Sequence, residues 1–195
     1  MKIALFGGTF NPIHLGHLIL AESARVQFQL GRVLFIPAGH PPHKQEILIS
    51  AHHRLAMIRL AVRGNPFFQV SDWEARQERS VYTCETLDYF LQDRRHEWFF
   101  LMGSDSLSRI HTWRSGAALL DRCSFLIAER PEKPWGSLPA LLRRKTRLIH
   151  SPPVAMASQE IRYRVGAGGS IRYHVPEAVA RYIQRHRLYR GKGSV

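Results

Sequence analysis

Short apolar runs alternate with longer amphipathic stretches along most of the chain. Five apolar runs have the length and composition of buried strands, and they cover residues 2–6, 32–36, 67–70, 97–102 and 124–128. Between them, apolar side chains recur at near-helical spacing, as they do from Leu15 to about Leu30. Strands that alternate with helices favour a parallel sheet wrapped by helices. The pattern therefore predicts an α/β fold: a Rossmann-like, twisted parallel sheet of about five strands, flanked by helices.

Helix starts are marked by residues that suit a first turn. Ser50 precedes one helical stretch, and Thr83 precedes another that runs to about Asp93. Both side chains carry the hydroxyl that accepts a backbone N–H at a helix N-cap. Pro176 stands where the last helix is expected to begin, because proline is tolerated in a first turn.

The character of the sequence changes after a proline pair that ends at Pro153. Two short helical segments follow, separated by the glycine-rich residues 166–170, which we interpret as a turn without a ligand contact. We expect a single domain over residues 1–195. In it, residues 1–151 form the α/β core and residues 152–190 form a small C-terminal helical part.

The composition is that of an ordinary globular protein. Hydrophobic residues make up 45% of the 195 residues and charged residues 22%, so folding needs no metal or disulfide framework. Cys84 and Cys123 are the only cysteines, and no apolar run approaches the roughly 18 to 20 residues that span a bilayer. We expect a cytoplasmic protein that does not cross a membrane.

The net charge is the one unusual bulk property. There are 28 lysine and arginine residues against 15 aspartate and glutamate residues, which leaves +13 with histidine neutral. Such an excess attracts polyanions, whether nucleic acid or nucleotide phosphates. A nucleic-acid-binding module would need basic residues concentrated on one face and exposed aromatic side chains, and neither is evident in the sequence. We therefore expect no nucleic-acid partner and keep that class as the alternative.

The segment from Gly7 to His17, which reads GGTFNPIHLGH, carries the first candidate chemistry. Gly7 and Gly8 let backbone N–H groups approach a phosphate, and the helix that follows offers its positive N-terminal end. His14 and His17 lie three residues apart, so both imidazoles can face the same anion. Gly16 removes a side chain that would obstruct a large ligand. The segment therefore predicts a phosphate site after the first strand.

Other ways of holding phosphate or metal fit this segment less well. Neither GxGxxG nor GxxxxGK[ST] is present, so histidine donors are the expected substitute. Two imidazoles at this spacing could share zinc, but no cysteine or nearby carboxylate completes a ligand set. We expect no metal site built from protein side chains.

The eleven residues from Gly7 to His17, with their HxGH pair, resemble the signature loop of the nucleotidyltransferase α/β phosphodiesterase superfamily. Further segments follow in order: Pro41-Pro42-His43-Lys44, Tyr82-Thr83 with Thr86-Leu87, Gly103-Ser104-Asp105-Ser106-Leu107, His111-Thr112-Trp113, Ser158 with Ile161-Arg162, Ser170-Ile171-Arg172-Tyr173 and Val175-Pro176-Glu177-Ala178-Val179. Together they resemble the bacterial nicotinate mononucleotide adenylyltransferases over nearly the whole chain.

The resemblance implies an enzyme of NAD biosynthesis that joins the adenylyl group of ATP to nicotinate mononucleotide and releases pyrophosphate. It assigns catalysis to His14, His17 and Arg162, with Arg162 at the far end of the phosphate chain. It assigns the binding of ATP to Gly8, Thr9, Phe10, Gly103, Asp105, Ser158 and Ile161, with Asp105 near the ribose. It assigns the mononucleotide to Lys44 at the phosphate, Trp113 stacked on the pyridine ring, and backbone donors of Tyr82 and Thr83 at the carboxylate.

These assignments agree with the chemistry that the reaction needs. Arginine can hold two phosphate oxygens at once, whereas a carboxylate would repel phosphate and belongs at the sugar. The mononucleotide phosphate is already a nucleophile, so we expect no general base and no covalent intermediate. We expect Mg²⁺ to arrive on ATP, the co-substrate, because the ion keeps its hydration and the sequence offers no carboxylate cage.

The sequence departs from the resemblance at residues 156–159, which read Met-Ala-Ser-Gln where the family usually has Ile-Ser-Ser-Thr. We expect Ser158 to cap the helix and to donate a hydrogen bond to phosphate. Either Ser158 contributes more to ATP binding than it does in relatives, or the affinity for ATP is lower than in relatives. Two related activities stay open: the same reaction on nicotinamide mononucleotide, and one on phosphopantetheine. Phosphopantetheine enzymes lack the Pro-Pro-His-Lys and Tyr-Thr segments, which favours the pyridine nucleotide.

Overall fold

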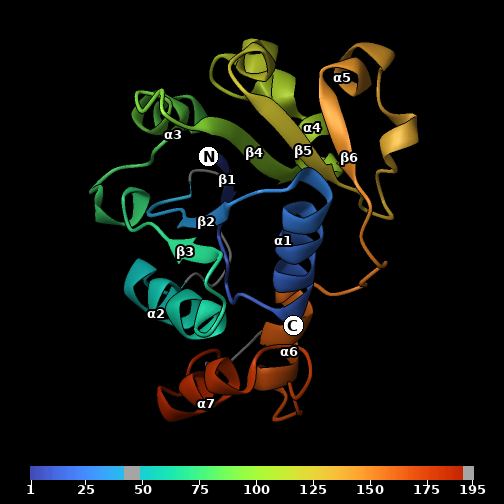
Figure 1. Cartoon of the computed structure of the whole chain (residues 1–195). Helices are drawn as coiled ribbons and strands as arrows, with labels where there is room; N and C mark the ends of the chain where they lie inside the picture. The colour runs from blue at the N-terminus through green and yellow to red at the C-terminus, as the bar shows by residue number, and fades with distance from the viewer. Residues whose placement is uncertain (42–48, 191–195) are drawn as a thin grey trace.

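The computed structural model describes residues 1–41 and 49–190, and it contains a six-stranded sheet (Figure 1). The strands are β1 (Lys2–Gly8), β2 (Arg32–Pro37), β3 (Phe68–Val70), β4 (Glu97–Gly103), β5 (Ser124–Ala128) and β6 (Thr146–Ile149). Their order across the sheet is β3-β2-β1-β4-β5-β6, and every neighbouring pair is parallel. The predicted α/β class is confirmed.

Helices follow most of the strands. The α-helices of the described residues are α1 (Leu15–Phe28), α2 (Ala51–Val62), α3 (Thr83–Phe90), α4 (Ser104–Ser108), α5 (Ala140–Arg144), α6 (Ser158–Gly166) and α7 (Glu177–Arg185). Short 3₁₀ segments are η1 (Glu74–Arg76), η2 (Ile110–Thr112), η3 (Gly116–Asp121) and η4 (Trp135–Ser137). Ser50 caps α2 as expected, because its Oγ accepts the His53 backbone N–H at 3.4 Å.

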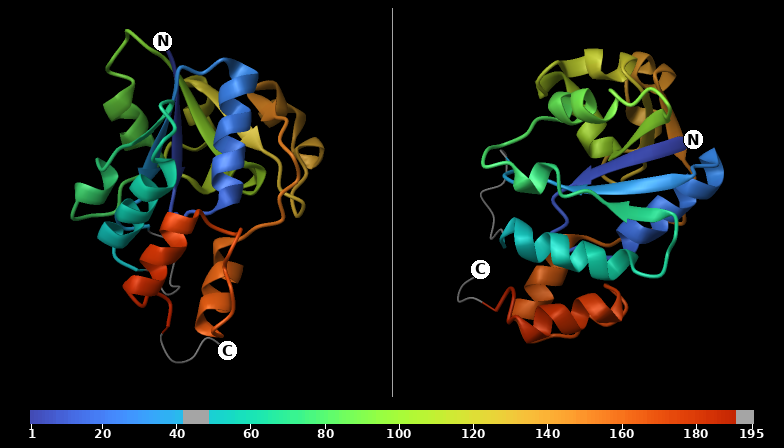
Figure 2. Two further views of the ribbon diagram at one scale, coloured as in Figure 1. Left: turned by 60° about the horizontal axis from the view of Figure 1, so that its bottom comes forward. Right: turned by 60° about the vertical axis from the view of Figure 1, so that its left-hand side comes forward.

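Each face of the sheet has its own apolar core, because alternate side chains of a strand point to opposite faces. Phe6, Phe35 and Phe99 belong to the core beneath α1 and α2. Leu5 and Phe100 belong to the core beneath α3, α4 and η3. Figures 1 and 2 show these helices on the two sides of the sheet. A parallel sheet that is covered on both faces has strands that read as continuous apolar runs, and this is why the sequence revealed them.

The C-terminal helices pack against the α/β part. Helix α7 lies beside α2 in both figures, and its Val179 and Ile183 are buried in the same core as Met57 and Ile58 of α2. The glycine-rich stretch after α6 forms a turn in which Gly168 has a φ of +74°. Residues from both ends of the chain therefore share one core.

The sixth strand, β6, was not predicted. It is only four residues long and lies at the edge of the sheet, with an exposed Arg147 inside it. An edge strand with a charged residue gives no continuous apolar run, so the hydrophobic pattern did not mark it.

Two of the predicted helix caps were wrong. Tyr82, not Thr83, is the N-cap of α3, because Tyr82 has extended backbone angles and Thr83 is already helical. That helix ends at Phe90 and does not reach Asp93. In the same way Ser158 is the first residue of α6, and its hydroxyl bonds elsewhere.

Candidate active site

The order in which strands are added to the sheet reverses direction after β3, because β4 pairs with the other side of β1. Strands β2 and β3 lie on one side of β1, and β4, β5 and β6 lie on the other. The connections that leave β1 and β4 therefore diverge, and ligands of open parallel sheets bind in the crevice at such a point. The loop after β1 and the Gly103 segment after β4, both expected as site segments, stand here.

The first loop, residues 8–14, ends at His14, which is the N-cap of α1. The rings of His14 and His17 are stacked with their centroids 3.6 Å apart. The His14 backbone N–H donates to Nδ1 of His17 at 3.2 Å. Because Nδ1 of a neutral imidazole accepts only when Nε2 carries the proton, His17 has its proton on Nε2. The orientation and tautomer of His17 are thus set by the helix start.

His14 is a neutral group at physiological pH. The residue is 3% exposed, and burial, together with the charge of Arg130, lowers its pKa to about 4. Its Nδ1 is buried without a hydrogen-bond partner among the described residues. Burial therefore favours the neutral imidazole, and a phosphate bound beside the ring would oppose this shift.

Two glycines make room for side chains of the site itself. A Cβ at Gly8 would lie 3.0 Å from the Phe10 ring, and a Cβ at Gly16 would lie 3.1 Å from Nδ1 of His14. The buried Phe10 ring in turn contacts the His17 ring, with centroids 5.0 Å apart. A larger residue at either position would push these rings out of place.

Side chains of the C-terminal part hold the backbone of the first loop. Nη1 of Arg162 donates to the Asn11 carbonyl at 3.0 Å. The Ser158 hydroxyl donates to the Pro12 carbonyl at 2.9 Å, and the Tyr189 hydroxyl donates to Oδ1 of Asn11 at 2.9 Å. Arg162 and Ser158 are thus brought to the loop that the resemblance assigns to ATP. The role of Tyr189 was not predicted.

Asp105 lies between two arginines at the end of β4. Its carboxylate is 3.8 Å from Nη2 of Arg109 and 4.0 Å from Nε of Arg130. A side chain at Gly103 would collide with this carboxylate, so glycine lets Asp105 fold back over the strand end. The Ser104 hydroxyl accepts the backbone N–H of Arg130 at 2.9 Å and so ties the two loops together. The sequence alone assigned no role to the Arg130 side chain.

The two arginines beside Asp105 line two different cavities. Arg130 lines a cavity of about 780 Å³ between α1, the ends of β5 and β6, and residues 150–156. Arg109 lines a cavity of about 890 Å³. The other residues that line the second cavity are Val81, Tyr82, Thr83, Thr112, Trp113 and Arg114. The three described residues predicted for the pyridine nucleotide are thereby brought together.

The start of α3 forms one wall of the second cavity. The Tyr82 backbone N–H donates to Oε2 of Glu85 at 2.9 Å, so this amide is occupied. The amides of Thr83 and Cys84 are the next donors of the first turn, and such amides have no acceptor within their own helix. The guanidinium carbon of Arg114 lies 5.4 Å from the centroid of the Tyr82 ring.

Two of the predicted site residues have no described side chain at the site. Lys44 lies outside the described residues. Ile161 is fully buried in the core, so only its backbone is available to a nucleotide. Within residues 1–41 and 49–190, no group of three His, Cys, Asp or Glu side chains is placed to hold a metal ion. In the same part of the chain, no helix is both long and apolar enough to cross a membrane.

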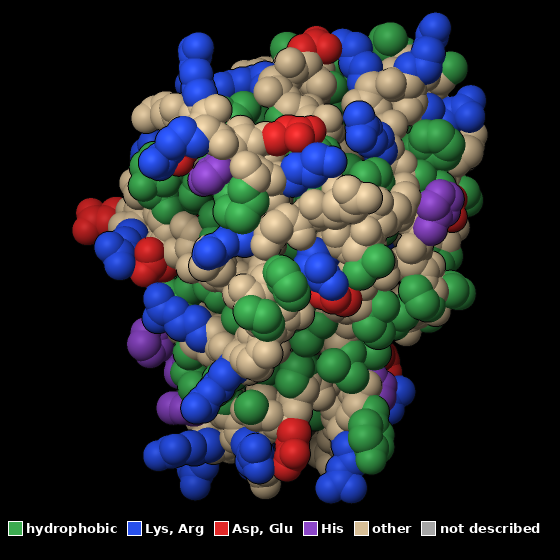
Figure 3. All heavy atoms as spheres, viewed as in Figure 1, with side chains coloured by type: hydrophobic (Ala, Val, Ile, Leu, Met, Phe, Trp, Pro, Cys, Tyr) green, Lys and Arg blue, Asp and Glu red, His purple; other side chains and the backbone are tan. Residues whose placement is uncertain are grey.

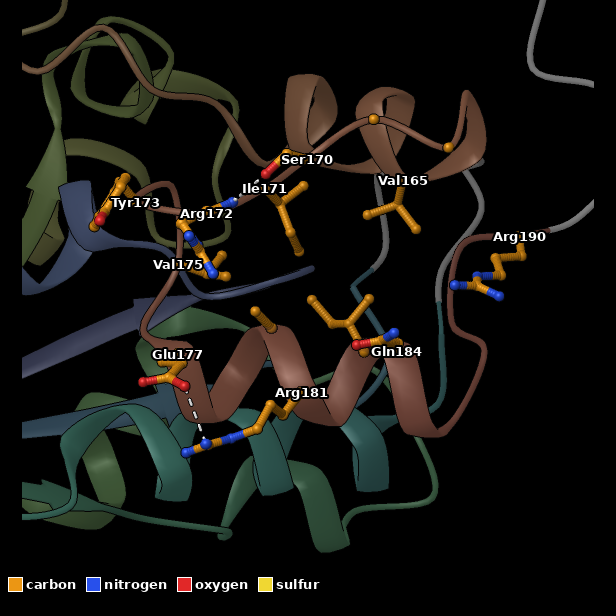
Figure 4. Close-up of a pocket in the computed structure, with 14 residues that line it drawn as sticks. Val165, Ser170, Ile171, Arg172, Tyr173, Val175, Glu177, Arg181, Gln184 and Arg190 are labelled. Carbon is orange, nitrogen blue, oxygen red and sulfur yellow. Dashed lines mark hydrogen bonds and ion pairs between the residues drawn. The ribbon is translucent and has the colours of Figure 1, made fainter.

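A further cavity of about 610 Å³ lies between α6 and α7 (Figure 4). Val165 and Ile171 point into it from one side and Gln184 of α7 from the other. None of the predicted site residues lines this cavity, and of the segment from Gly7 to His17 only Gly16 lines the cavity of Arg130. The cavity of Arg109 is lined by three predicted residues, so we place the candidate active site there, at Asp105 and at the first loop.

Known proteins resemble this chain in sequence and in fold. A family model described as cytidylyltransferase-like matches residues 5–165. The chain belongs to the cytidylyltransferase-like family. A family member from Herpetosiphon aurantiacus, described as "Probable nicotinate-nucleotide adenylyltransferase", is 42% identical over 96% of this chain and 98% of its own length. One from Thermomicrobium roseum with the same description is 41% identical over 97% of this chain and 92% of its own length.

A solved structure supports the fold of this family member. The Plasmodium falciparum nicotinic acid mononucleotide adenylyltransferase, complexed with NaAD, matches with a TM-score of 0.80 at 20% identity, over 96% of this chain and 97% of that one. The resemblance inferred from the sequence is confirmed by these relatives.

Proposed function

We propose that this family member transfers the adenylyl group of ATP to nicotinate mononucleotide and releases pyrophosphate, as a step of NAD biosynthesis. The observation that carries the proposal is the pair of cavities that are lined by the two arginines beside Asp105. A product made of two nucleotide halves needs a two-part site of this kind. The descriptions of the relatives and the dinucleotide bound to the Plasmodium falciparum structure support the same reaction.

The ATP half occupies the cavity lined by Arg130. Its walls include the apolar side chains of Ile149 and Val154, which suit a purine base. Asp105 can accept hydrogen bonds from the ribose hydroxyls. The phosphates then lie over the first loop and the N-terminus of α1, where backbone amides and the helix dipole favour negative charge.

The nicotinate mononucleotide half occupies the cavity lined by Arg109. Trp113 stacks on the pyridine ring, and the carboxylate meets the amides at the start of α3. The Tyr82 amide is already bound to Glu85, so Thr83 and Cys84 supply these donors. Lys44 binds the phosphate of this substrate.

The reaction is an in-line displacement at the α-phosphorus. An oxygen of the mononucleotide phosphate forms the new P–O bond, and the bond to the bridging oxygen of the β-phosphate breaks, so that pyrophosphate leaves with the electron pair. No proton has to be removed from the nucleophile. His14, His17 and Arg162 stabilise the charge that grows on the phosphate oxygens. Mg²⁺ that arrives with the nucleotide phosphates would neutralise part of this charge.

The direct test is to incubate the protein with ATP and one acceptor at a time and to measure pyrophosphate and the dinucleotide. We expect nicotinate mononucleotide to give a higher kcat/KM than nicotinamide mononucleotide, and phosphopantetheine to give no product. A preference for the amide or for phosphopantetheine would contradict the proposal.

Nucleic-acid binding is the alternative from a different class, and the surface does not favour it. In Figure 3 the lysine and arginine side chains are spread over the whole visible face, with acidic side chains between them. A polyanion would favour one continuous basic stripe. A salt titration with oligonucleotides tests this point, because binding through several phosphates weakens steeply as salt rises.

A further inference from the structure

Arg54 is a charged side chain that the reaction described above does not use. It lies on α2 and is 0% exposed. Its Nη1 donates to the Thr9 carbonyl at 2.9 Å, its Nη2 to the Gly39 carbonyl at 2.9 Å, and its Nε to the Ile49 carbonyl at 3.2 Å. Within the described part of the chain, its partners are therefore three backbone carbonyls.

These three carbonyls belong to the first loop and to the two flanks of residues 42–48. Thr9 is in the first loop, where the ATP phosphates lie. Gly39 and Ile49 stand on either side of residues 42–48, which contain Lys44, the proposed ligand of the mononucleotide phosphate. A guanidinium is planar and its donors form a rigid fork. One rigid group thus fixes the first loop relative to both flanks of the Lys44 segment.

We infer that Arg54 is a positioning residue that sets the distance between the α-phosphorus of ATP and the attacking mononucleotide phosphate. The inference rests on the proposed function. In a displacement without a covalent intermediate, placement supplies much of the rate, and a shift of about 1 Å can cost roughly a hundredfold.

Packing alone does not account for an arginine at this position. A buried polar group is costly unless it is hydrogen-bonded, and the cost is greater for a charge. Met57 and Ile58 show that α2 fills the same core with apolar side chains. On the far side of the loop, a Cβ at Gly39 would collide with the backbone of Glu74. Gly39 is therefore held between Arg54 and Glu74 and has little room to move.

The kinetic test compares Arg54→Met and Arg54→Lys with Arg59→Met. Arg59 is on the same helix, but it is exposed and pairs with Asp72 at 3.3 Å, so it is the matched control. We expect Arg54→Met to lower kcat about a hundredfold and to raise KM for both substrates. Arg54→Lys keeps the charge, but a compact ammonium cannot span three carbonyls, so kcat stays roughly tenfold low. Arg59→Met should stay near the parent values.

Hydrogen exchange measured by mass spectrometry supplies a readout that does not need turnover. In folded Arg54→Lys, the amides of the first loop between Thr9 and His14 and those of residues 38–40 should both exchange faster, while the core strands β1 and β2 keep their protection. If Arg54→Met does not fold, Arg54→Lys decides the matter.

The inference is overturned if folded Arg54→Lys keeps the parent kcat, both parent KM values and unchanged exchange in both loops. It is also overturned if only one substrate or one loop is affected. Failure of the proposed function shows itself differently: the parent protein itself would then make no dinucleotide from nicotinate mononucleotide, whatever happens to the loops in the variant.

Discussion

The first loop and the wall of the second cavity differ in how far their residues are exposed. In the first loop, the carbonyls of Thr9, Asn11 and Pro12 each accept a hydrogen bond from a side chain far away in the sequence. The wall of the second cavity is more accessible. There the Tyr82 side chain is 38% exposed, and Arg114 is exposed beside it. The proposed ATP side has its loop held by side chains from elsewhere in the chain, whereas the proposed pyridine side presents an exposed tyrosine and an exposed arginine.

This difference suggests a division of labour. Donors held in place before the reaction cost no reorganisation when charge develops, and they act mainly on kcat. Exposed aromatic surfaces are ordered by the ligand that covers them, so they act mainly on affinity. Substitutions on the two sides should therefore change different kinetic parameters.

The largest effect is expected at the histidine pair. Replacing His17 with alanine removes a donor that the His14 amide has already oriented. We expect His17→Ala to lower kcat by roughly a hundredfold to a thousandfold, the loss typical of one prearranged transition-state donor. Steady-state kinetics measures the loss, and circular dichroism should show an intact fold. Turnover near the parent rate would mean that the stacked pair is structural.

A smaller effect, and on the other parameter, is expected at Trp113. Trp113→Ala should weaken nicotinate mononucleotide far more than ATP, because one stacked ring is worth about 1 to 3 kcal/mol, or roughly fivefold to over a hundredfold in affinity. Calorimetric titration with each substrate measures the two losses separately. Arg162→Ala is the counterpart and should weaken ATP while leaving the mononucleotide nearly unchanged. Equal losses for both substrates in both folded variants would remove the distinction between the two sides.

Much of the fold could be read from local patterns. Strands β1, β2, β4 and β5 are buried on both faces, and burial on both faces produces the continuous apolar runs that marked them. The edge strand β6 has no such pattern. The N-caps predicted at Thr83 and Ser158 were wrong by one residue. A hydroxyl side chain favours a helix start, but it does not show whether its own residue is the cap or the first helical residue.

The candidate site was predictable only in part, for a similar reason. The histidines and Asp105 follow strand ends, and strand ends of a parallel sheet meet at one edge. The contact between Tyr189 and Asn11 joins residues 178 positions apart, and no local pattern records it. Arg54 left a weak signal that was not used: it lies three and four residues before Met57 and Ile58, on the apolar side of α2.

A stability effect without a kinetic one is expected at Glu74, whose carboxylate accepts the Thr86 hydroxyl of α3 at 2.6 Å. Burial raises the pKa of Glu74 from 4.5 to about 6. A raised carboxyl pKa stabilises the fold below the unfolded value of about 4.5, and this stability is lost as pH rises through about 6. Glu74→Gln should therefore gain up to about 2 kcal/mol over the parent at pH 8, and much less at pH 5. Urea unfolding at the two pH values measures the gain.

The result at Glu74 separates support of the cavity wall from substrate binding. The KM values of Glu74→Gln should remain near those of the parent, because the carboxylate contacts the buried Thr86 of α3 and does not line the second cavity. A gain that is equal at pH 5 and pH 8 would show that the carboxylate does not titrate between them. A gain in stability that comes with a large change in either KM value would show that substrate binding in the second cavity depends on the packing behind α3.

The smallest effect is expected at Tyr189, which holds the first loop from the far end of the chain. Tyr189→Phe removes the hydroxyl that donates to Oδ1 of Asn11 but keeps the buried ring. The loss of one such hydrogen bond costs about 0.5 to 1.5 kcal/mol of stability, and the loosened loop should raise KM for ATP more than KM for the mononucleotide. Tyr182→Phe is the control, because it removes a hydrogen bond to His53 at 3.0 Å from the same C-terminal part, away from the first loop. Thermal unfolding and the two KM values should be measured for each variant. If both variants lose similar stability but only Tyr189→Phe changes KM for ATP, then ATP binding depends on how firmly the first loop is held. The general stability of the C-terminal part would then not be the cause.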